Sequence, residues 1–432
     1  MARPSAASAR VLAARILDAV LHRGRSLRAE FNDALPRLDD VRDRALVEAI
    51  VFAALRQRAR YQAALDAWTG KPLGRKDNEL RALLLAGFAQ LDGLGLAEHA
   101  AVSETVEATR QLGRPHQAGL VNALLRRALR EGLPDGDPAQ AWPAWLARCI
   151  RADWPQHADA IFAESARAAP LWLRVNRRHG TLAEYQARLA NAGIDARPHP
   201  LLADGLRVDA PLPVTALPGF AEGHVSVQDG SAQRVADALA PTAGMRVLDA
   251  CAAPGGKTAH LLERHPDVTV IALDADARRV RRMTDTFARL GLPAQVRVGD
   301  GTQAKDWWNG HPYDRILIDA PCSATGIVRR QPDVLLHRRE ADISALRDTQ
   351  ARLLDALWPL LAPGGELVYA TCSILRAEND QQVTAFLQRT TDARLLPLDA
   401  GFGHDTGHGH QRLPGEEGMD GFFIARLHKP AA

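Results

Sequence analysis

Two cysteines of this chain stand where each could act as a nucleophile. Cys322 follows an apolar run within the sequence Asp319-Ala-Pro-Cys, and Cys372 follows another run within Thr371-Cys-Ser. A thiolate is a strong nucleophile near neutral pH, because its surroundings can lower the ordinary thiol pKa of about 8.5. Packing as a small buried side chain is the alternative fate of a free cysteine. Spacing alone does not decide which of the two would attack a substrate.

Three acidic residues stand at the ends of similar apolar runs, namely Asp274, Asp300 and Asp319. The carboxyl ends of parallel strands meet at one edge of a sheet, and ligands bind there. Because the pattern recurs along the chain, we expect these carboxylates and the two cysteines to line one site.

A glycine-rich turn opens the same region. Residues 247–250 form a short apolar run interrupted by Asp249, residues 251–256 read Cys-Ala-Ala-Pro-Gly-Gly, and a helix is expected from Lys257 to about Arg264. Glycines let a ligand approach the backbone, and a helix start offers free N–H groups. Strand, turn and helix in this order are typical of nucleotide-binding α/β domains. A turn that merely closes a strand–helix unit is the alternative.

The spacing around the turn favours a cofactor with a ribose. A phosphate-binding Walker loop would need a glycine where this chain has Cys251. Asp274 follows Gly256 by 18 residues, close to the spacing of about 20 at which an acidic residue reaches ribose hydroxyls.

The elements that position these residues fall into three regions. From about residue 241 predicted strands alternate with helices, which indicates the α/β class with a doubly wound, mostly parallel sheet. Residues 5 to about 132 show helical periodicity throughout, and a proline-rich linker follows. Between these regions the sequence predicts a small α+β module, with a helix that opens at the capping-box match Thr181-Leu-Ala-Glu184. In the last region, helices are expected at 277–290 and 343–361. We therefore expect domains at 1–140, 141–240 and 241–432.

Five motifs, in order DACAAPGGKT, LDAD, GDG, DAPCSATG and YATCS, resemble the RNA 5-methylcytosine methyltransferases of the Nop2/Sun class. Further matches near Asn176, Gln228 and Phe422 extend the resemblance over the whole chain, to the bacterial members that act on small-subunit ribosomal RNA. The resemblance implies a Rossmann-like methyltransferase domain preceded by an all-α NusB-like, RNA-binding bundle and a ferredoxin-like extension.

The resemblance also implies S-adenosyl-L-methionine as cofactor. Asp274 would bind the ribose hydroxyls, Asp300 the adenine amino group, and Asp319 would lie between cofactor and substrate. The turn would hold the methionine end through Ala250, Cys251, Ala252, Ala253, Pro254, Gly255, Gly256 and Lys257. No metal is implied.

The implied chemistry explains the cysteines. Carbon 5 of cytosine is a poor nucleophile until a thiolate adds at carbon 6, after which a base must remove the carbon-5 proton. By the resemblance Cys372 is the nucleophile, Cys322 assists proton removal or product release, and Asp319 polarises the ring through N3 or N4.

Composition permits RNA binding without requiring it. The chain has 432 residues, a net charge of +3 and only five lysines among its 54 basic residues. Arginine suits phosphate contacts, although a GC-rich genome would also favour it. The arginines of the first helices predict either an RNA-binding face or a solvated one.

Four cysteines without a C-x-x-C pair make zinc a poor interpretation and favour a reducing cytoplasm. No apolar run approaches the length of about 20 residues that crosses a membrane. We expect a cytoplasmic monomer with rRNA as partner and neither metal nor membrane.

Two further groups of residues leave alternatives open. Arg174, Asn176 and Arg177 could touch RNA or simply belong to a structural strand. The histidines in the glycine-rich stretch 400–415 (His404, His408 and His410) could suggest a metal, but they lack fixed spacing and a flexible loop is the alternative.

The sequence therefore predicts a cytosine-C5 methyltransferase of 16S rRNA. One alternative is a transfer RNA methyltransferase, but the NusB-like region resembles the rRNA enzymes and favours rRNA as the substrate. A non-catalytic RNA-binding assembly factor is the other, against which the intact acidic and cysteine residues speak.

Overall fold

The computed structural model describes residues 6–210 and 212–431 and divides the chain into two compact units. One unit holds the residues up to Ala168 together with Val328–Arg338. The other holds Ala169–Ile327 and the residues from Arg339 onward. Within the described residues, no helix is both long and apolar enough to cross a membrane.

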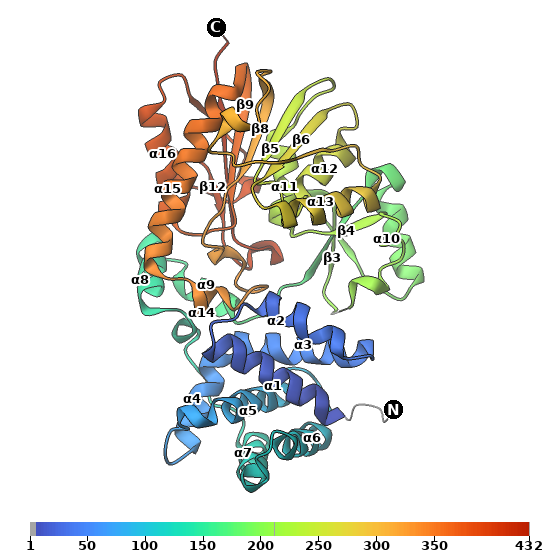
Figure 1. The fold of residues 1–432 in the computed structure, drawn as a ribbon, viewed down its shortest axis with the longest axis vertical. Coiled ribbons are helices and arrows are strands. Elements are labelled where there is room, and N and C mark those ends of the chain that lie inside the picture. Colours follow the sequence, from blue (N-terminus) through green and yellow to red (C-terminus); the bar gives the residue numbers. More distant parts are fainter. Residues whose placement is uncertain (1–5, 211, 432) are drawn as a thin grey trace. The chain divides into compact units, whose positions relative to one another are not determined.

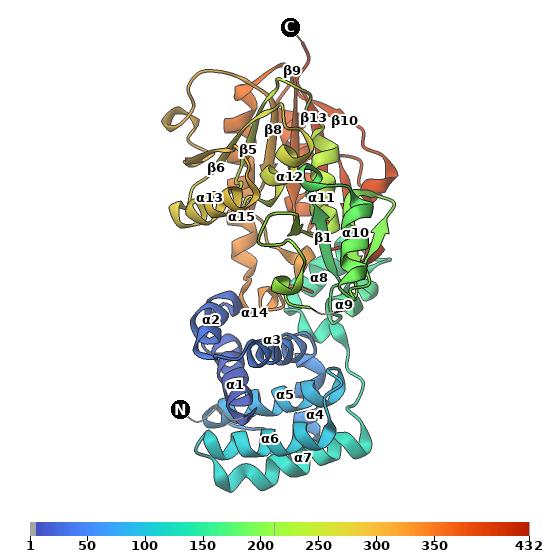
Figure 2. The same cartoon turned by 90° about the vertical axis from the view of Figure 1, so that its right-hand side faces the viewer.

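The first unit is helical, as the periodicity predicts (Figures 1 and 2). Its helices are α1 (Ala6–His22), α2 (Leu27–Ala34), α3 (Val41–Arg56), α4 (Arg58–Trp68), α5 (Asn78–Asp92), α6 (Glu98–Gln111), α7 (Ala118–Glu131), α8 (Ala144–Asp153), α9 (Ala158–Ser165) and α14 (Val334–His337). The apolar faces of α1 to α7 meet in one core, in which Leu17, Ile50 and Leu84 are fully buried. Helices α8 and α9 occupy part of the region expected as an α+β module.

Several arginines of the first helices are paired within this unit. Arg10 is buried, and its Nε donates to Gln90 at 2.9 Å. Arg23 pairs with Asp18, and Arg25 pairs with Glu30 at 2.7 Å. These contacts favour a structural use for part of the cluster.

The segment Val328–Arg338 joins the helical unit although it follows the DAPCSATG motif in sequence. The N–H of Leu27 donates to Asp333 at 2.9 Å, and Arg56 Nε donates to the carbonyl of Arg329 at 2.7 Å. Nothing in the sequence pattern predicted this association.

A small module begins the second unit, with α10 (Leu182–Asn191) and four antiparallel strands in the order β2-β3-β1-β4. The strands are β1 (Leu171–Val175), β2 (Arg197–His199), β3 (Leu202–Val208) and β4 (Val225–Val227). Helix α10 begins at the predicted capping box, in which Thr181 and Glu184 each bond the other's backbone.

The main sheet has the order β11-β12-β13-β9-β8-β5-β6-β7, with β10 beside β13. Its strands are β5 (Arg246–Ala250), β6 (Thr269–Asp274), β7 (Gln295–Val298), β8 (Tyr313–Asp319), β9 (Leu361–Thr371), β10 (Arg394–Leu396), β11 (His404–Asp405), β12 (His410–Arg412) and β13 (Phe422–His428). Strands β5 to β9 pair in parallel, and β13 pairs antiparallel with β9. The doubly wound, mostly parallel sheet is confirmed.

Helices cover both faces of this sheet (Figure 1). They are α11 (Gly230–Leu239), α12 (Gly256–Arg264) and α13 (Ala277–Leu290) on one face, with α15 (Glu340–Leu357) and α16 (Asp380–Arg389) on the other. Alternate strand residues enter the two cores: Val270 and Ala272 face α11 to α13, whereas Ile271 and Leu273 face α15 and α16.

Two predicted boundaries were wrong. The helix expected at 343–361 ends at Leu357, because the chain turns through a 3-10 segment at Trp358–Leu360 that includes a proline. The stretch 400–415, expected as a loop, contains β11 and β12, which extend the sheet beside β13.

Candidate active site

A cavity of about 360 Å³ lies at the carboxyl ends of the parallel strands. The strand order reverses between β5 and β8, and such a reversal is where open α/β sheets bind ligands. The predicted residues that line the cavity are Cys251, Ala253, Asp274, Asp300, Asp319, Cys322 and Cys372. The sequence thus identified residues that converge from five strand ends.

The remaining predicted turn residues are not among those that line the cavity: Ala250, Ala252, Pro254, Gly255, Gly256 and Lys257. Cavity residues that the sequence analysis missed include Arg279, Thr302, Thr349 and Leu353. Arg279 lies in the first turn of the helix after Asp274, and Thr349 and Leu353 are four residues apart on one helix face. These spacings could have suggested them.

The glycine turn is held by backbone geometry. Gly255 has a φ of 95°, in the left-handed region that favours glycine. A Cβ added there would lie 2.8 Å from Met283 and 3.0 Å from Phe287 of α13. The turn therefore packs closely against α13, and α12 begins at the next residue.

Asp274 is buried at the end of β6 and binds the backbone of the turn. One carboxylate oxygen accepts from the N–H of Ala253 at 3.1 Å, and the other accepts from the N–H of Asp276 at 3.1 Å. Arg279 lies 3.5 Å from the carboxylate. Because Asp274 also borders the cavity, its carboxylate can contact both the turn and a ligand bound in the cavity.

Asp300 lies beyond the end of β7, where its Oδ1 accepts from the N–H and the hydroxyl of Thr302, both at 2.8 Å. Its neighbours Gly299 and Gly301 also line the cavity. A Cβ on Gly301 would lie 2.7 Å from Leu353, so a larger residue at this position would collide with the Leu353 side chain.

Lys257 and Asp319 form an ion pair, with Nζ 2.6 Å from Oδ2. Burial lowers the pKa of Lys257, but the charge and hydrogen bond of Asp319 together raise it by more, so the pKa lies above its ordinary value. Lys257 therefore remains a cation. The sequence analysis placed Lys257 in the turn and did not predict this pairing.

The two candidate nucleophiles are in contact, with 3.4 Å between Cys322 Sγ and Cys372 Sγ. Both cysteine side chains are partly exposed, so neither serves only as a fully buried core residue. The pKa of the Cys322 thiol is raised by its hydrogen bond with Cys372, by burial and by the charge of Glu378. Cys322 therefore keeps its proton and can donate it toward the sulfur of Cys372.

A third cysteine borders the cavity but is poorly suited to attack. Burial raises the pKa of Cys251 to about 12, and the charges of Asp319 and Asp274 add to the effect. Its thiolate is therefore scarce at neutral pH.

A buried carboxylate behind the cysteines joins the two cysteine-bearing loops. Glu378 accepts from the N–H of Ser323 at 2.9 Å, from Gln350 at 3.1 Å and from the hydroxyl of Ser373 at 2.6 Å. Ser323 and Ser373 each follow one of the cysteines, so Glu378 fixes the loops on which the sulfur atoms meet. The sequence analysis did not single it out.

The other candidate groups lie outside the cavity. Arg174 and Asn176 are buried, so contact of their side chains with RNA is excluded, and Arg177 pairs with Asp204. Among the described residues no group of histidine, cysteine and acidic side chains could hold a metal. His404 instead pairs with Glu416, and His408 bonds Thr384.

Three protein families match the chain in sequence: the NusB family over residues 7–130, a ferredoxin-like domain of RsmF/B-like methyltransferases over 142–215, and the 16S rRNA methyltransferase RsmB/F over 236–428. A ribosomal RNA small subunit methyltransferase B from Xanthomonas campestris pv. campestris is 60% identical over 424 residues, which cover 98% of this chain and 97% of that protein.

Solved structures share the fold. The crystal structure of PH0851 matches with a TM-score of 0.79 and 22% identity over 99% of this chain and 100% of that one. A methyltransferase homolog protein from Pyrococcus horikoshii matches with a TM-score of 0.59 and 28% identity over 70% of this chain and 98% of that one. The NusB-like, ferredoxin-like and methyltransferase folds expected from the sequence are confirmed.

Proposed function

The chain belongs to the family of 16S ribosomal RNA methyltransferases described as RsmB/F, and we propose that it methylates carbon 5 of a specific cytosine in that RNA. S-adenosylmethionine would supply the methyl group. The observation that carries the proposal is the pair of cysteines in contact at the edge of the cavity, at 3.4 Å.

The chemistry of the cavity wall supports the cofactor. Asp274 and Asp300 present carboxylate oxygens, which accept hydrogen bonds from ribose hydroxyls and from an adenine amino group. Gly299 and Gly301 line the same wall, where their backbone is directly accessible to a ligand. The residues present thus fit a nucleoside, and the turn at 250–257 would bind the methionine end.

Asp319 and Lys257 support recognition of the base. A carboxylate accepts from the N4 amino group of cytosine, and the adjacent ammonium of Lys257 orients that carboxylate. Asp319 would therefore hold and polarise the ring while the sulfur atoms act on it.

The cysteine pair supports a covalent route. The thiolate of Cys372 would form a bond to carbon 6, which makes carbon 5 an enamine-like nucleophile that accepts the methyl group. A water molecule would take the carbon-5 proton, and the electron pair of that C–H bond restores the ring double bond as the bond to sulfur breaks, so that Cys372 leaves as a thiolate. Cys322 would assist this elimination, because its sulfur lies beside that of Cys372.

Separate substitution of the two cysteines tests this route. With labelled 16S rRNA and S-adenosylmethionine, Cys322→Ala should still form the carbon-6 bond and then stall, because elimination is slowed. A denaturing gel should show a slow RNA–protein band for Cys322→Ala, and none for Cys372→Ala or for the double variant. Cys149→Ala on α8, at a cysteine that does not line the cavity, should behave as the wild type.

A trapped band in Cys372→Ala alone would assign the attack to Cys322. Absence of both product and band in every protein, including the wild type, would favour a non-catalytic RNA-binding role.

A further inference from the structure

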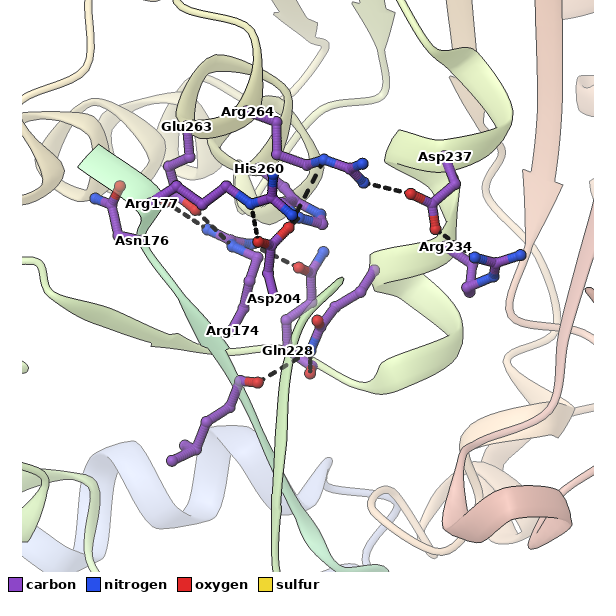
Figure 3. Close-up of polar contacts among 12 residues, drawn as sticks. Arg174, Asn176, Arg177, Asp204, Gln228, Arg234, Asp237, His260, Glu263 and Arg264 are labelled. Carbon is purple, nitrogen blue, oxygen red and sulfur yellow. Dashed lines mark hydrogen bonds and ion pairs between the residues drawn. The ribbon is translucent and has the colours of Figure 1, made fainter. Parts of the chain in front are cut away.

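A buried arginine of the small module reaches the backbone of the cofactor turn. Figure 3 shows this arginine, Arg174, beside Glu263 and Gln228. Arg174 lies on β1, and its side chain is 1% exposed. Its Nη1 donates to the carbonyl of Gly256 at 2.7 Å and to Gln228 at 2.6 Å. Its Nε and Nη2 both donate to Glu263 at 2.8 Å. The guanidinium of Arg174 therefore donates hydrogen bonds from all three of its nitrogen atoms.

The bonds of Arg174 span α12 from its first turn to its last. Gly256 begins the helix, and Glu263 follows seven residues later, two turns on along the same face. Arg174 therefore fixes both the position of the helix along its axis and the orientation of its N-terminal turn. That turn contains Gly256 and Lys257, two of the residues proposed above to hold the methionine end of the cofactor; Cys251 and Ala253 of the same segment line the cavity.

The ion pair between Arg174 and Glu263 is buried on both sides. The side chain of Glu263 is also 1% exposed. Burial raises the pKa of Glu263 although Arg174 opposes the effect. A buried carboxylate of this kind depends on its partner, because an isolated buried charge is strongly destabilising.

Neighbouring groups fix the same helix independently. Asp204 on β3 accepts from His260 of α12 at 2.9 Å and pairs with Arg177 (Figure 3). Asp237 pairs with Arg264 at the end of α12. The helix thus stays docked through other contacts when Arg174 is changed, so the effect of Arg174 on the turn can be measured.

We propose that Arg174 is a positioning residue for S-adenosylmethionine, by which the ferredoxin-like module sets the shape of the cofactor turn in the methyltransferase domain. The inference rests on the proposed cofactor. Arg174 belongs to the ferredoxin-like match at 142–215, whereas Gly256 and Glu263 belong to the methyltransferase match at 236–428. The module would therefore contribute to cofactor affinity without touching the cofactor.

The test separates positioning from stability with three variants of the full chain. Arg174→Met leaves Glu263 buried and unpaired, so both the melting temperature and the affinity for S-adenosylmethionine should fall. Arg174→Met with Glu263→Met removes the whole pair, so the melting temperature should recover toward that of the wild type. Its affinity should stay about tenfold or more below the wild type, because the bond to the Gly256 carbonyl is still absent.

Glu263→Gln is the matched control. It keeps a side chain for the Arg174 fork and leaves the bond to Gly256 in place, so calorimetry should give an affinity within about threefold of the wild type, whatever the loss of stability.

Wild-type affinity in the double variant would overturn the proposal, as would an affinity loss in Glu263→Gln equal to that in Arg174→Met. A wild-type chain that does not bind S-adenosylmethionine would remove the proposed cofactor and this inference together. Binding by the wild type and by every variant alike would remove this inference alone.

Discussion

The carboxylate of Asp274 accepts hydrogen bonds from the backbone of Ala253 and Asp276, and it also borders the cavity. If it binds ribose hydroxyls, Asp274→Ala should weaken S-adenosylmethionine binding by about 1–3 kcal/mol, the value of a hydrogen bond to a charged group. Isothermal titration calorimetry measures this directly.

Asp276 supplies the control for that measurement. It caps α13 by accepting from the N–H groups of Arg278 and Arg279, but it does not line the cavity. Asp276→Ala should cost about 1 kcal/mol of unfolding free energy through the lost cap and leave cofactor affinity unchanged. Equal losses of affinity in the two variants would mean that Asp274 acts only by shaping the turn.

Single residues were predictable where a strand ends and unpredictable where a contact crosses between elements. Cys322, Cys372 and Asp319 follow apolar runs, and parallel strands bring such ends together. Glu378 and Arg174 follow no such pattern, because their roles depend on distant partners: Ser323 lies 55 residues from Glu378, and Glu263 lies 89 residues from Arg174. Arg174 was expected either at RNA or in a plain strand; the structure buries it, and its partners could not be read from one sequence.

Helix α12 carries a titratable group that makes its docking sensitive to acid. Burial lowers the pKa of His260 to about 4; the hydrogen bond with Asp204 opposes this effect, and the charges of Arg174 and Arg264 add to it. The folded protein therefore holds a neutral imidazole at pH 7. Since the unfolded chain binds a proton near pH 6.5, acid favours unfolding once the pH falls below that value.

The loss should develop between pH 6.5 and 4, with full stability retained above this window. At its lower end it should reach about 3 kcal/mol of unfolding free energy. Urea unfolding of the wild type at pH 7.5, 5.5 and 4.5 would record it, and His260→Gln should show a flatter profile across the window. His311→Gln, at an exposed histidine, should keep the wild-type profile. An equal slope in wild type and His260→Gln would exclude His260 as the source.

Elements were predicted best where periodicity or capping was strong. Helix α13 was expected at 277–290, and α10 begins at its predicted cap, since the residues that decide both are local in sequence. The β11 and β12 strands were missed because each is only two or three residues long and depends on pairing with β13. Pairing with a distant strand leaves little trace in so short a stretch.

At the scale of the whole molecule, motifs and periodicity predicted the three folds, but contacts divide the chain differently. The segment Val328–Arg338 groups with the helices of the first unit, although the residues on both sides of it in sequence belong to the second. The segment begins directly after the loop that carries Cys322. The expected domain boundaries at 140 and 240 remain predictions, and so does an RNA-binding role for the bundle.

The central claim is that this chain methylates one cytosine of 16S rRNA through Cys372. Mass mapping of 5-methylcytosine in RNA from a strain that lacks the chain tests it most directly. One 16S cytosine should lose its methyl group in that strain and regain it when the wild-type chain is supplied, but not when Cys372→Ala is supplied. Unchanged 16S rRNA with a loss in transfer RNA, or restoration by Cys372→Ala, would contradict the account.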